Sequence, residues 1–282
     1  MRLRFTKMNG AGNDFILLDA LREPIPTDAL PALARRLCDR RRSIGADGLM
    51  VLDRSEVADF SMRFVNSDGS FGEMCGNGAR CICRYGVEHG YAGEAPVIET
   101  TAGLVYGWRI DRRNYRVQLN SPSVVRLDDR LTVDEKTYTV SYVELGDPGI
   151  PHAVVELPGL RDADEDELRR LGRALRYHPA FPKGANVNFY ERTGADTVLE
   201  RTYERGVEDF TLACGTGTGS VVAVLTRKGL VSGKNVAVTM PGGTLSVDIL
   251  KPDAEPEQIF LTGPTTMVAE GEILDEDLEV SI

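Results

Sequence analysis

The sequence predicts an α+β protein made of two similar domains. The tetrapeptide Cys-Gly-x-Gly occurs at residues 75–78 and again at residues 214–217. The offset between the two cysteines, 214 − 75 = 139 residues, is close to half of the 282-residue chain, as expected for a duplicated fold. Short alternating or β-branched runs greatly outnumber helical patterns. Because strands dominate and few helices can pack against them, the class is α+β rather than a doubly wound α/β sheet.

Strands are expected where β-branched and aromatic residues alternate or cluster between turn signals. Such runs span residues 60–65, 115–119, 138–143, 236–240 and 245–250. Helices are expected where an apolar pattern of helical spacing follows a capping residue, a glycine turn or an acidic first turn. These segments span residues 28–41, 76–89, 164–175 and 215–228.

Two turn-rich segments mark where the chain crosses between the domains. The first is Asn-Ser-Pro-Ser at residues 120–123, and the second is Gly-Pro at residues 263–264. After the second crossing, residues 267–273 return to the first half as a terminal strand. We therefore expect an N-terminal domain at residues 1–121, completed by residues 268–282 as a returning strand, and a C-terminal domain at residues 122–267.

Composition and charge exclude several classes of protein. With 42% hydrophobic and 27% charged residues, the chain is globular and long enough for two full cores. The net charge of −10 argues against nucleic acid and anionic membranes, so an acidic substrate must meet a locally positive site. The N-terminal residues lack the apolar stretch of a signal peptide, and five cysteines, an odd number, indicate reduced thiols. We expect a cytoplasmic protein.

Each Cys-Gly-x-Gly runs into small and apolar residues, which predicts that Cys75 and Cys214 lie at the N-termini of two helices. There the free backbone N–H groups and the helix dipole favour a thiolate and can also hold a carboxylate. Two such cysteines suit racemisation, because a proton must leave one face of an sp³ carbon and return on the other. The spacing predicts one cysteine in each of two domains that face each other across a cleft.

Other interpretations of these segments stay open. A free cysteine at a glycine turn is most often a small buried hydrophobe, and we assign that role to Cys38, Cys81 and Cys83. Zinc is not expected, because Cys75, Cys81 and Cys83 lack Cys-x-x-Cys spacing and nearby histidines. The glycine turns lack the Lys-Ser/Thr of a phosphate loop and the full dinucleotide fingerprint. A redox sensor, in which two thiols form a regulatory disulfide, is the non-catalytic alternative.

Five segments together carry a family resemblance. They are residues 9–15, residues 44–48, residues 66–69 leading into 74–81, residues 186–189, and residues 203–206 leading into 213–217. In this order and spacing they resemble the diaminopimelate epimerases, which are two-cysteine amino-acid epimerases, over the full length of the chain. The resemblance implies two pseudo-symmetric domains, each a curled, mostly antiparallel sheet around a central helix, with the active site between them.

The resemblance also implies roles for particular residues. Cys75 and Cys214 are the catalytic pair. Arg205 grips a substrate carboxylate, which suits the two parallel N–H donors of a guanidinium, and Glu204 holds an ammonium group. On their own these two residues would pass for an ordinary ion pair. The other implied substrate-binding residues offer side-chain amides or backbone N–H groups, and they are Asn13, Asn66, Gly76, Asn77, Asn186, Gly215 and Thr216. The sequence around Asn66 also fits a plain turn.

The implied reaction converts LL-diaminopimelate to the meso form, in lysine and peptidoglycan precursor biosynthesis. One cysteine, as thiolate, removes the α-proton, and the other, as thiol, protonates the opposite face. Backbone N–H groups at the two helix N-termini hold the α-carboxylate as its charge rises. The family further implies a homodimer that needs neither a cofactor nor a metal.

One segment departs from the family pattern. Where many members carry Gly-Asn-Pro-His, this chain has Gly-Ile-Pro-His at residues 149–152. Ile150 has no hydrogen-bonding side chain, so recognition of the distal end of the substrate lacks one amide. The alternative is therefore a racemase or epimerase of the same fold that acts on another polar amino acid, such as histidine. His152 is expected to be a structural neighbour of this loop rather than a base.

Overall fold

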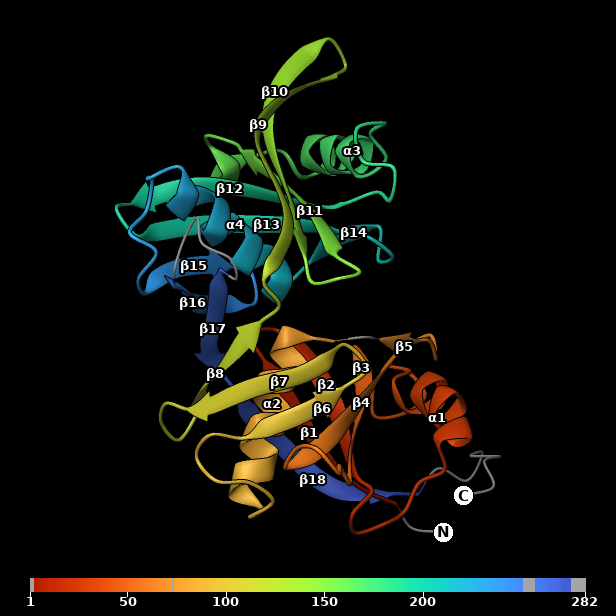
Figure 1. The fold of residues 1–282 in the computed structure, drawn as a ribbon. Helices are drawn as coiled ribbons and strands as arrows, with labels where there is room; N and C mark the ends of the chain where they lie inside the picture. The colour runs from red at the N-terminus through yellow and green to blue at the C-terminus, as the bar shows by residue number, and fades with distance from the viewer. Residues whose placement is uncertain (1–2, 73, 251–256, 275–282) are drawn as a thin grey trace. The chain divides into compact units, whose positions relative to one another are not determined.

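The computed structural model describes residues 3–72, 74–250 and 257–274. The chain divides into two compact units. Unit 1 comprises residues 1–117 and 263–282, and unit 2 comprises residues 118–262. Each unit is a mixed sheet with a small number of helices, as Figure 1 shows. Within the described residues, no helix has the length and apolar character needed to cross a bilayer.

Unit 1 is a sheet whose crossover connections carry its helices. Its strands are β1 (Leu3–Gly10), β2 (Asn13–Asp19), β3 (Gly48–Asp53), β4 (Phe60–Asn66), β5 (Phe71–Gly72), β6 (Val97–Thr100), β7 (Gly103–Arg109) and β18 (Thr266–Ile273). Its helices are η1 (Thr27–Ala29), α1 (Leu30–Leu37) and α2 (Gly76–Glu88). The strand order is β18, β1, β2, β3, β4, β6, β7, and the pairs β2–β3 and β4–β6 are parallel.

Unit 2 repeats this design. Its strands are β9 (Pro122–Val133), β10 (Lys136–Leu145), β11 (Ile150–Glu156), β12 (Asn186–Gly194), β13 (Thr197–Glu204), β14 (Asp209–Thr211), β15 (Val236–Met240) and β16 (Gly243–Leu250). Its helices are η2 (Leu160–Asp162), α3 (Glu165–Arg176) and α4 (Gly215–Arg227). The order is β9, β10, β11, β12, β13, β15, β16, with parallel pairs β11–β12 and β13–β15. Strands β8 (Asn114–Leu119) and β17 (Gln258–Pro264) run across the unit boundaries.

The two units therefore share one sequence of antiparallel and parallel pairings. In each unit the first parallel crossover carries a surface helix, α1 or α3, and the second carries a buried helix, α2 or α4. A short extra strand, β5 or β14, pairs with the strand before the buried helix. This repeat confirms the predicted fold class of two similar, mostly antiparallel sheets with few helices.

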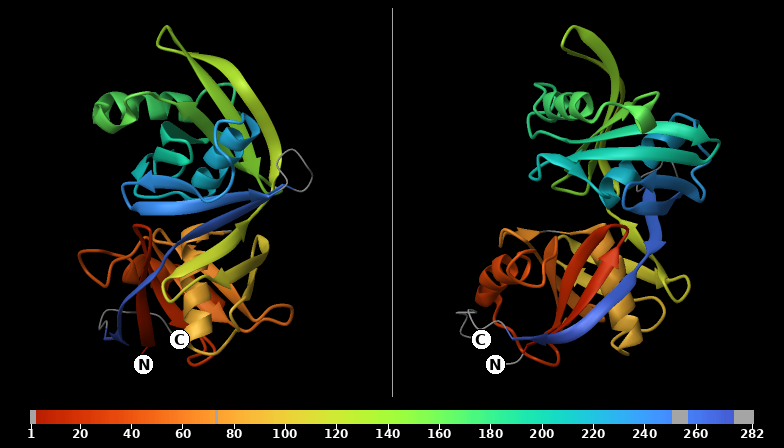
Figure 2. Two further views of the ribbon diagram at one scale, coloured as in Figure 1. Left: turned by 90° about the vertical axis from the view of Figure 1, so that its left-hand side faces the viewer. Right: turned by 180° about the vertical axis from the view of Figure 1, so that it is seen from behind.

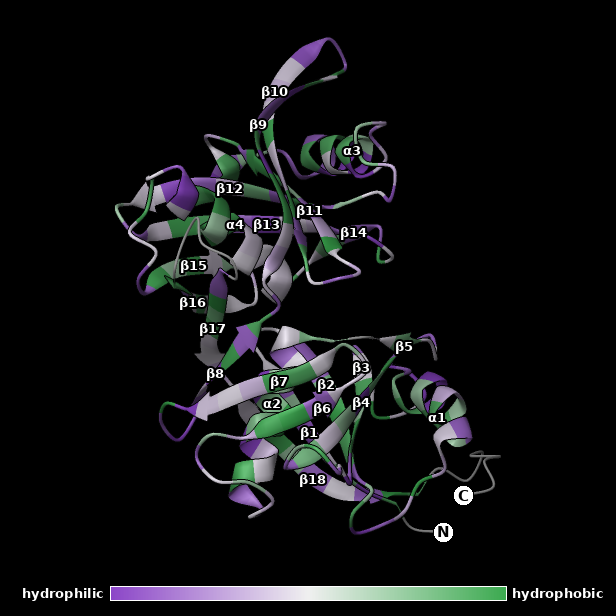
Figure 3. Cartoon of the chain, in the orientation of Figure 1, coloured by the Kyte–Doolittle hydropathy of each residue, from purple (hydrophilic) through white to green (hydrophobic). Residues whose placement is uncertain are grey.

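Helices α2 and α4 are buried on nearly every side, and each is the central helix of its unit. Residues 76–86 of α2 are all buried, and α2 contacts β1, β2, β3, β4 and β7. Helix α4 likewise contacts β10, β11, β12 and β16. A helix that touches strands across the width of its own sheet requires that sheet to curl around it. By contrast, α3 buries only Leu168, Gly172 and Leu175, and Figure 3 shows hydrophobic and hydrophilic residues in alternation along it.

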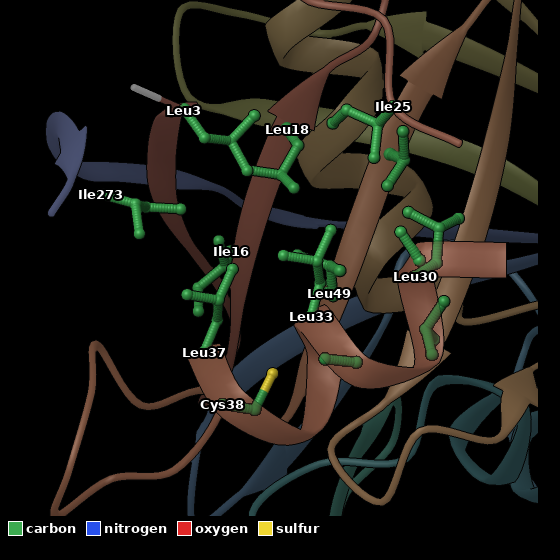
Figure 4. Packing of buried hydrophobic residues seen from close by; sticks show 14 of the residues in the cluster. Leu3, Ile16, Leu18, Ile25, Leu30, Leu33, Leu37, Cys38, Leu49 and Ile273 are labelled. Atoms are coloured by element: carbon green, nitrogen blue, oxygen red, sulfur yellow. The ribbon is translucent and has the colours of Figure 1, made fainter. Parts of the chain in front are cut away.

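The surface helix of unit 1 closes a hydrophobic core on the outer side of the sheet. Leu30, Leu33 and Leu37 of α1 are fully buried against Ile16 and Leu49 of β2 and β3. Figure 4 shows these side chains pointing toward one another, with Cys38 at the end of the helix. Burying a leucine side chain contributes about 1.5–3 kcal/mol, so this face fixes α1 on the sheet.

Most of the predicted elements are confirmed. The strands expected at residues 60–65, 115–119, 138–143, 236–240 and 245–250 are β4, β8, β10, β15 and β16. The strand expected at residues 267–273 is β18, which pairs antiparallel with β1 and runs beside it in Figure 2. The helices expected at residues 76–89, 164–175 and 215–228 are α2, α3 and α4.

The helix predicted at residues 28–41 is shorter than expected. Helix α1 ends at Leu37, and a turn follows in which one carboxylate oxygen of Asp39 accepts the backbone N–H groups of Arg41 and Arg42. These bonds and the Arg42 guanidinium lower the pKa of Asp39 to about 2. A side chain that captures backbone N–H groups in this way competes with helix continuation, which explains the early end.

Candidate functional site

Cys75 is the N-cap residue of α2. Its backbone is extended, with φ −127° and ψ 112°, and its sulfur accepts a hydrogen bond from the Gly78 N–H at 3.4 Å. The side chain is partly exposed, while the helix behind it is buried. The cap geometry follows from the sequence, since a residue with a side-chain acceptor precedes a glycine turn that lets backbone N–H groups point outward.

Cys214 holds the corresponding position in unit 2. It is the N-cap residue of α4, with φ −128° and ψ 104°, and its sulfur lies 3.7 Å from the Thr216 hydroxyl oxygen. The two cysteines thus share one backbone conformation at the start of the central helix of their units. The expectation that both lie at helix N-termini is confirmed.

The two cysteines differ in their surroundings. Cys214 is buried, and this burial raises the pKa of its thiol well above the ordinary value. The negative charges of Glu204 and Glu200 raise it further, while the Gly217 N–H and the Thr216 hydroxyl act in the opposite direction. Cys214 is therefore a thiol at neutral pH, because desolvation outweighs the helix N-terminus.

The glycines after each cysteine are required by close packing. A Cβ atom at position 217 would overlap the side-chain amide nitrogen of Asn188 and would lie 3.2 Å from the Cys214 sulfur. A Cβ atom at position 78 would lie 3.0 Å from the Met50 sulfur. The spacing Cys-Gly-x-Gly therefore keeps the first helical turn narrow and leaves its N–H groups accessible.

In unit 1 the structure brings Asn13 and Asn77 together. The Asn77 amide donates to the side-chain oxygen of Asn13, and the Asn13 amide donates to Asp47 at 3.1 Å. Asn66 is at the end of β4, opposite Gly48, and its backbone and side-chain N–H groups both bond to Ser70. Asn66 therefore stabilises a turn, which is the alternative role that the sequence around it left open.

In unit 2 the structure brings Asn186 and Arg205 together. Asn186 begins β12, and its side-chain oxygen accepts the backbone N–H of Arg205 at 2.8 Å. Glu204 is the last residue of β13. The exposed Arg205 guanidinium donates to the Lys183 carbonyl at 3.2 Å. Gly215 and Thr216 form the first turn of α4 behind Cys214.

A buried polar network beneath Cys214 was missed by the sequence reasoning. The Glu200 carboxylate is fully buried and accepts hydrogen bonds from Thr218 at 2.7 Å and from Asn188 at 3.0 Å. The Thr218 hydroxyl also lies 2.9 Å from the Cys214 carbonyl oxygen. Burial raises the pKa of Glu200 to about 7, against the opposing effect of these donors. The available signal was the spacing of four residues between Glu200 and Glu204, an even number that places both on one face of β13.

The loop that departs from the family pattern leads into the same network. Ile150 begins β11, and His152 on the same strand is fully buried. Its Nδ1 lies 3.0 Å from the side-chain oxygen of Asn188, and burial lowers the pKa of His152 to about 4. His152 is therefore neutral at neutral pH and is joined to the Glu200 network through Asn188.

The remaining cysteines are core residues, as predicted. Cys38, Cys81 and Cys83 are buried, and burial raises the pKa of Cys38 and Cys81 to about 12. Within the described part of the chain, no group of His, Cys, Asp or Glu side chains is placed to hold a metal ion.

The comparisons with known proteins agree with this arrangement. The family model for diaminopimelate epimerase matches residues 5–125 and 146–268. The chain is 38% identical over 292 residues to a diaminopimelate epimerase of Archaeoglobus fulgidus, covering 100% of both chains. It is also 38% identical to one of Aquifex aeolicus, covering 98% of this chain and 100% of the relative.

Solved structures show the same fold at lower identity. A phenazine biosynthesis protein of the PhzF family from Bacillus anthracis superposes with a TM-score of 0.75 at 16% identity, covering 97% of this chain and 99% of that one. A probable proline racemase from Agrobacterium radiobacter gives 0.71 at 18% identity, covering 98% and 94%. With the family model and the curated relatives matched over nearly the whole chain, this protein belongs to the diaminopimelate epimerase family.

Proposed function

We propose that this protein is a diaminopimelate epimerase, an isomerase that interconverts the LL and meso forms of diaminopimelate in lysine and peptidoglycan precursor biosynthesis. The observation that carries the proposal is the full-length similarity to curated diaminopimelate epimerases together with a cysteine at the N-cap of the central helix in each unit. Such a pair supplies one base and one acid of the same chemical type, which an epimerase needs because its reaction runs in both directions.

The mechanism uses one thiolate and one thiol. The thiolate of one cysteine takes the α-proton, and the electron pair of the broken C–H bond stays on carbon. The S–H group of the other cysteine then gives its proton to the opposite face. After the turnover the two cysteines have exchanged protonation states, so the reverse reaction uses them in exchanged roles. Cys214, which its buried setting keeps as a thiol, suits the proton donor of the first turnover.

The carbanion is stabilised by fixed donors rather than by a cofactor. Backbone N–H groups near Gly76, Asn77, Gly215 and Thr216 lie in the first turns of α2 and α4, where the helix dipole favours negative charge. A preorganised donor aimed at developing charge is commonly worth ~3–4 kcal/mol in an active site. We assign these groups to the α-carboxylate of the substrate.

Polar side chains are assigned to the rest of the substrate. Asn13, Asn66 and Asn186 offer side-chain amides, which can meet either end of a zwitterion. Glu204 is assigned to an ammonium group, and Arg205 to the distal carboxylate. Both belong to the β13 end of unit 2, which supports a shared role. The protein is further proposed to act in the cytoplasm as a homodimer without a cofactor, on the basis of family membership.

A second candidate is a racemase or epimerase of the same fold that acts on another polar amino acid. The observation in its favour is Ile150 at the start of β11, since an isoleucine offers no hydrogen bond to a distal ammonium or carboxylate. A histidine substrate would need fewer distal partners. The two candidates share their chemistry and differ only in substrate.

The test is incubation of the purified protein in deuterium oxide with a panel of amino acids, scored for α-deuterium by mass spectrometry. The proposal predicts incorporation into diaminopimelate well above that into histidine. Robust exchange into histidine with negligible exchange into diaminopimelate would promote the second candidate. Absence of exchange into every amino acid, with a disulfide between Cys75 and Cys214 on mild oxidation, would favour the redox sensor.

A further inference from the structure

Arg80 is a fully buried arginine on α2, one turn beyond Cys75. Its guanidinium donates to the Gly76 carbonyl at 3.2 Å and to the side-chain oxygen of Asn77 at 2.8 Å. The Nε atom of Arg80 lacks a hydrogen-bond partner. Within the described residues, no carboxylate forms an ion pair with the Arg80 guanidinium, whereas Arg84 on the same helix is paired with Glu88. Burial lowers the pKa of Arg80 only to about 10, so the side chain remains a cation at neutral pH.

A buried cation without a counter-ion is costly, so its retention calls for a reason. Within the described residues, the ionisable groups that would act on the Arg80 charge are Cys81, Cys75 and Cys83, and of these only Cys75 is partly exposed. A thiolate at Cys75, or an anion bound at the start of α2, would supply the missing negative charge. The position is therefore poised to stabilise charge that appears only during the reaction.

Arg80 also begins a polarised chain of hydrogen bonds. Arg80 donates to Asn77, Asn77 donates to Asn13, and Asn13 donates to Asp47. A guanidinium can only donate, and an ionised carboxylate can only accept. With these two groups at its ends, the chain allows a single orientation of each amide between them. Each amide then keeps one N–H that the chain does not use.

The far end of this chain is firmly held. Asp47 also accepts the Asp14 backbone N–H at 3.1 Å and the Arg40 guanidinium at 2.7 Å. Arg40 makes two hydrogen bonds to Asp14, which is also paired with Lys7 at 2.8 Å. Asp47 thus cannot turn away from Asn13 without breaking a network of charged groups.

Other charged groups near α2 are already balanced. The strands packed against the helix, and the helix itself, carry charged residues that form pairs with each other or with adjacent segments. These pairs are Arg4 with Glu23, Lys7 with Asp14, Arg22 with Asp19, Arg63 with Asp53, Arg109 with Glu94, and Arg84 with Glu88. Arg80 is the buried cation of this set that has no such partner within the described residues.

We propose that Arg80 is a positioning residue of the reaction: it locks Asn77 and Asn13 with their free N–H groups toward a substrate carboxylate, and it holds positive charge at the Cys75 end of α2. The part that concerns the substrate rests on the proposed epimerase function. The part that concerns Cys75 does not. Asn77 and Asn13 contact the substrate, whereas Arg80 acts through them.

The test is the rate of Cys75 alkylation by iodoacetamide as a function of pH, in a Cys214→Ala background where the other cysteines are buried. Replacing the cation by Arg80→Met should raise the apparent pKa of Cys75 by about one unit and slow alkylation at neutral pH about tenfold. Arg80→Lys keeps the charge and should leave the profile close to that of the parent. Arg84→Lys, one turn further along α2, is the matched control and should also leave it unchanged.

A second readout tests the amide lock, with Cys214 restored. Arg80→Lys offers one point of attachment in place of a planar fork, so the Asn77 and Asn13 amides should lose their fixed orientation. KM should rise about tenfold with a smaller fall in kcat, since ground-state and transition-state binding are lost together. Asp47→Asn should give the same KM effect with an unchanged alkylation profile. An unaltered alkylation profile in Arg80→Met together with an unaltered KM in Arg80→Lys and Asp47→Asn would overturn the proposal. If Arg80→Met does not fold, the KM values of Arg80→Lys and Asp47→Asn decide it.

Discussion

Cys75 and Cys214 have the same backbone conformation, but different charged residues act on them within the described part of the chain. Cys75 lies on a helix that contains the buried cation Arg80, whereas Cys214 lies beside the carboxyl groups of Glu204 and Glu200. A cation favours a thiolate and a carboxylate favours a thiol. The duplicated cysteines are therefore chemically unequal before any substrate binds.

The buried carboxyl of Glu200 predicts an unusual dependence of stability on pH. Its pKa is about 7 in the folded protein and near the ordinary 4.5 in an unfolded chain. Between pH 4.5 and pH 7 the folded state binds a proton at Glu200 that the unfolded state has lost. The contribution of this proton to the free energy of unfolding is therefore complete below pH 4.5 and is lost as the pH rises through 7. Its full size is about 3 kcal/mol at ~1.4 kcal/mol per pKa unit.

Glu200→Gln mimics the protonated side chain at every pH and should remove this dependence. The measurement is Tm from about pH 5 to pH 8 for the parent and the variant. The parent should lose more Tm across this range than Glu200→Gln does. Parallel curves for the two proteins would show that Glu200 does not titrate in this window.

The assignment of Arg205 predicts a substrate-dependent effect. In a diaminopimelate epimerase, Arg205→Ala leaves the distal carboxylate of the substrate unpaired and should cost ~3–5 kcal/mol in transition-state binding. A substrate without that carboxylate should lose far less. The measurement is kcat/KM on diaminopimelate and on histidine for both proteins. An equal loss on the two substrates would contradict the assignment.

At the scale of the element, the helix N-termini depend on their glycines. Gly217→Ala would push the new Cβ atom against Asn188 and toward the Cys214 sulfur. A displacement of a catalytic group by about 1 Å can cost ~100-fold in rate, so kcat/KM should fall steeply. Gly93→Ala is the matched control, because a Cβ atom at position 93 meets nothing within 4 Å. Full activity in Gly217→Ala would refute the packing argument.

Helix α3 depends on a single capping residue. Asp164 accepts hydrogen bonds from the backbone N–H groups of Asp166 and Glu167. Asp164→Ala should therefore lower the free energy of unfolding by about 1 kcal/mol. Asp166→Ala removes an acidic side chain from the same turn that is 89% exposed, and it should change stability little. Urea unfolding of the parent and the two variants measures both changes in stability. Equal free energies of unfolding for Asp164→Ala and the parent would show that Asp164 does not stabilise the helix as a cap.

Local signals predicted most elements well, but they did not predict which polar side chains the fold buries. The starts of α2 and α4 were predictable because Cys-Gly-x-Gly is a local turn signal, and β15 and β16 because their alternation is local. The end of α1 was not, because the Asp39 turn competes with the helix through a side chain. Glu200 and Asn188 were missed for another reason, since polar residues on strands ordinarily face solvent. Only the folded structure shows that they are buried: Asn188 lies on β12, which packs against α4, and Glu200 is bonded to Thr218 of α4.

At the scale of the whole molecule, duplication is the main feature. The two units repeat one order of antiparallel and parallel pairs, and each places a cysteine at the start of its central helix. The fold class and the family were predictable because five motifs and the spacing of 139 residues (214 − 75) agree. The domain boundaries at residues 121 and 267 stay predictions, as do the roles of the individual site residues.

In the proposed mechanism, one cysteine from each unit acts on the same α-carbon. The most direct measurement is α-deuterium incorporation into LL- and meso-diaminopimelate in deuterium oxide by the parent, Cys75→Ala and Cys214→Ala, with folding checked by circular dichroism. We expect exchange and epimerisation by the parent, and loss of epimerisation by orders of magnitude in each folded variant, because water cannot replace a positioned thiol. Substantial epimerisation by either alanine variant would contradict it.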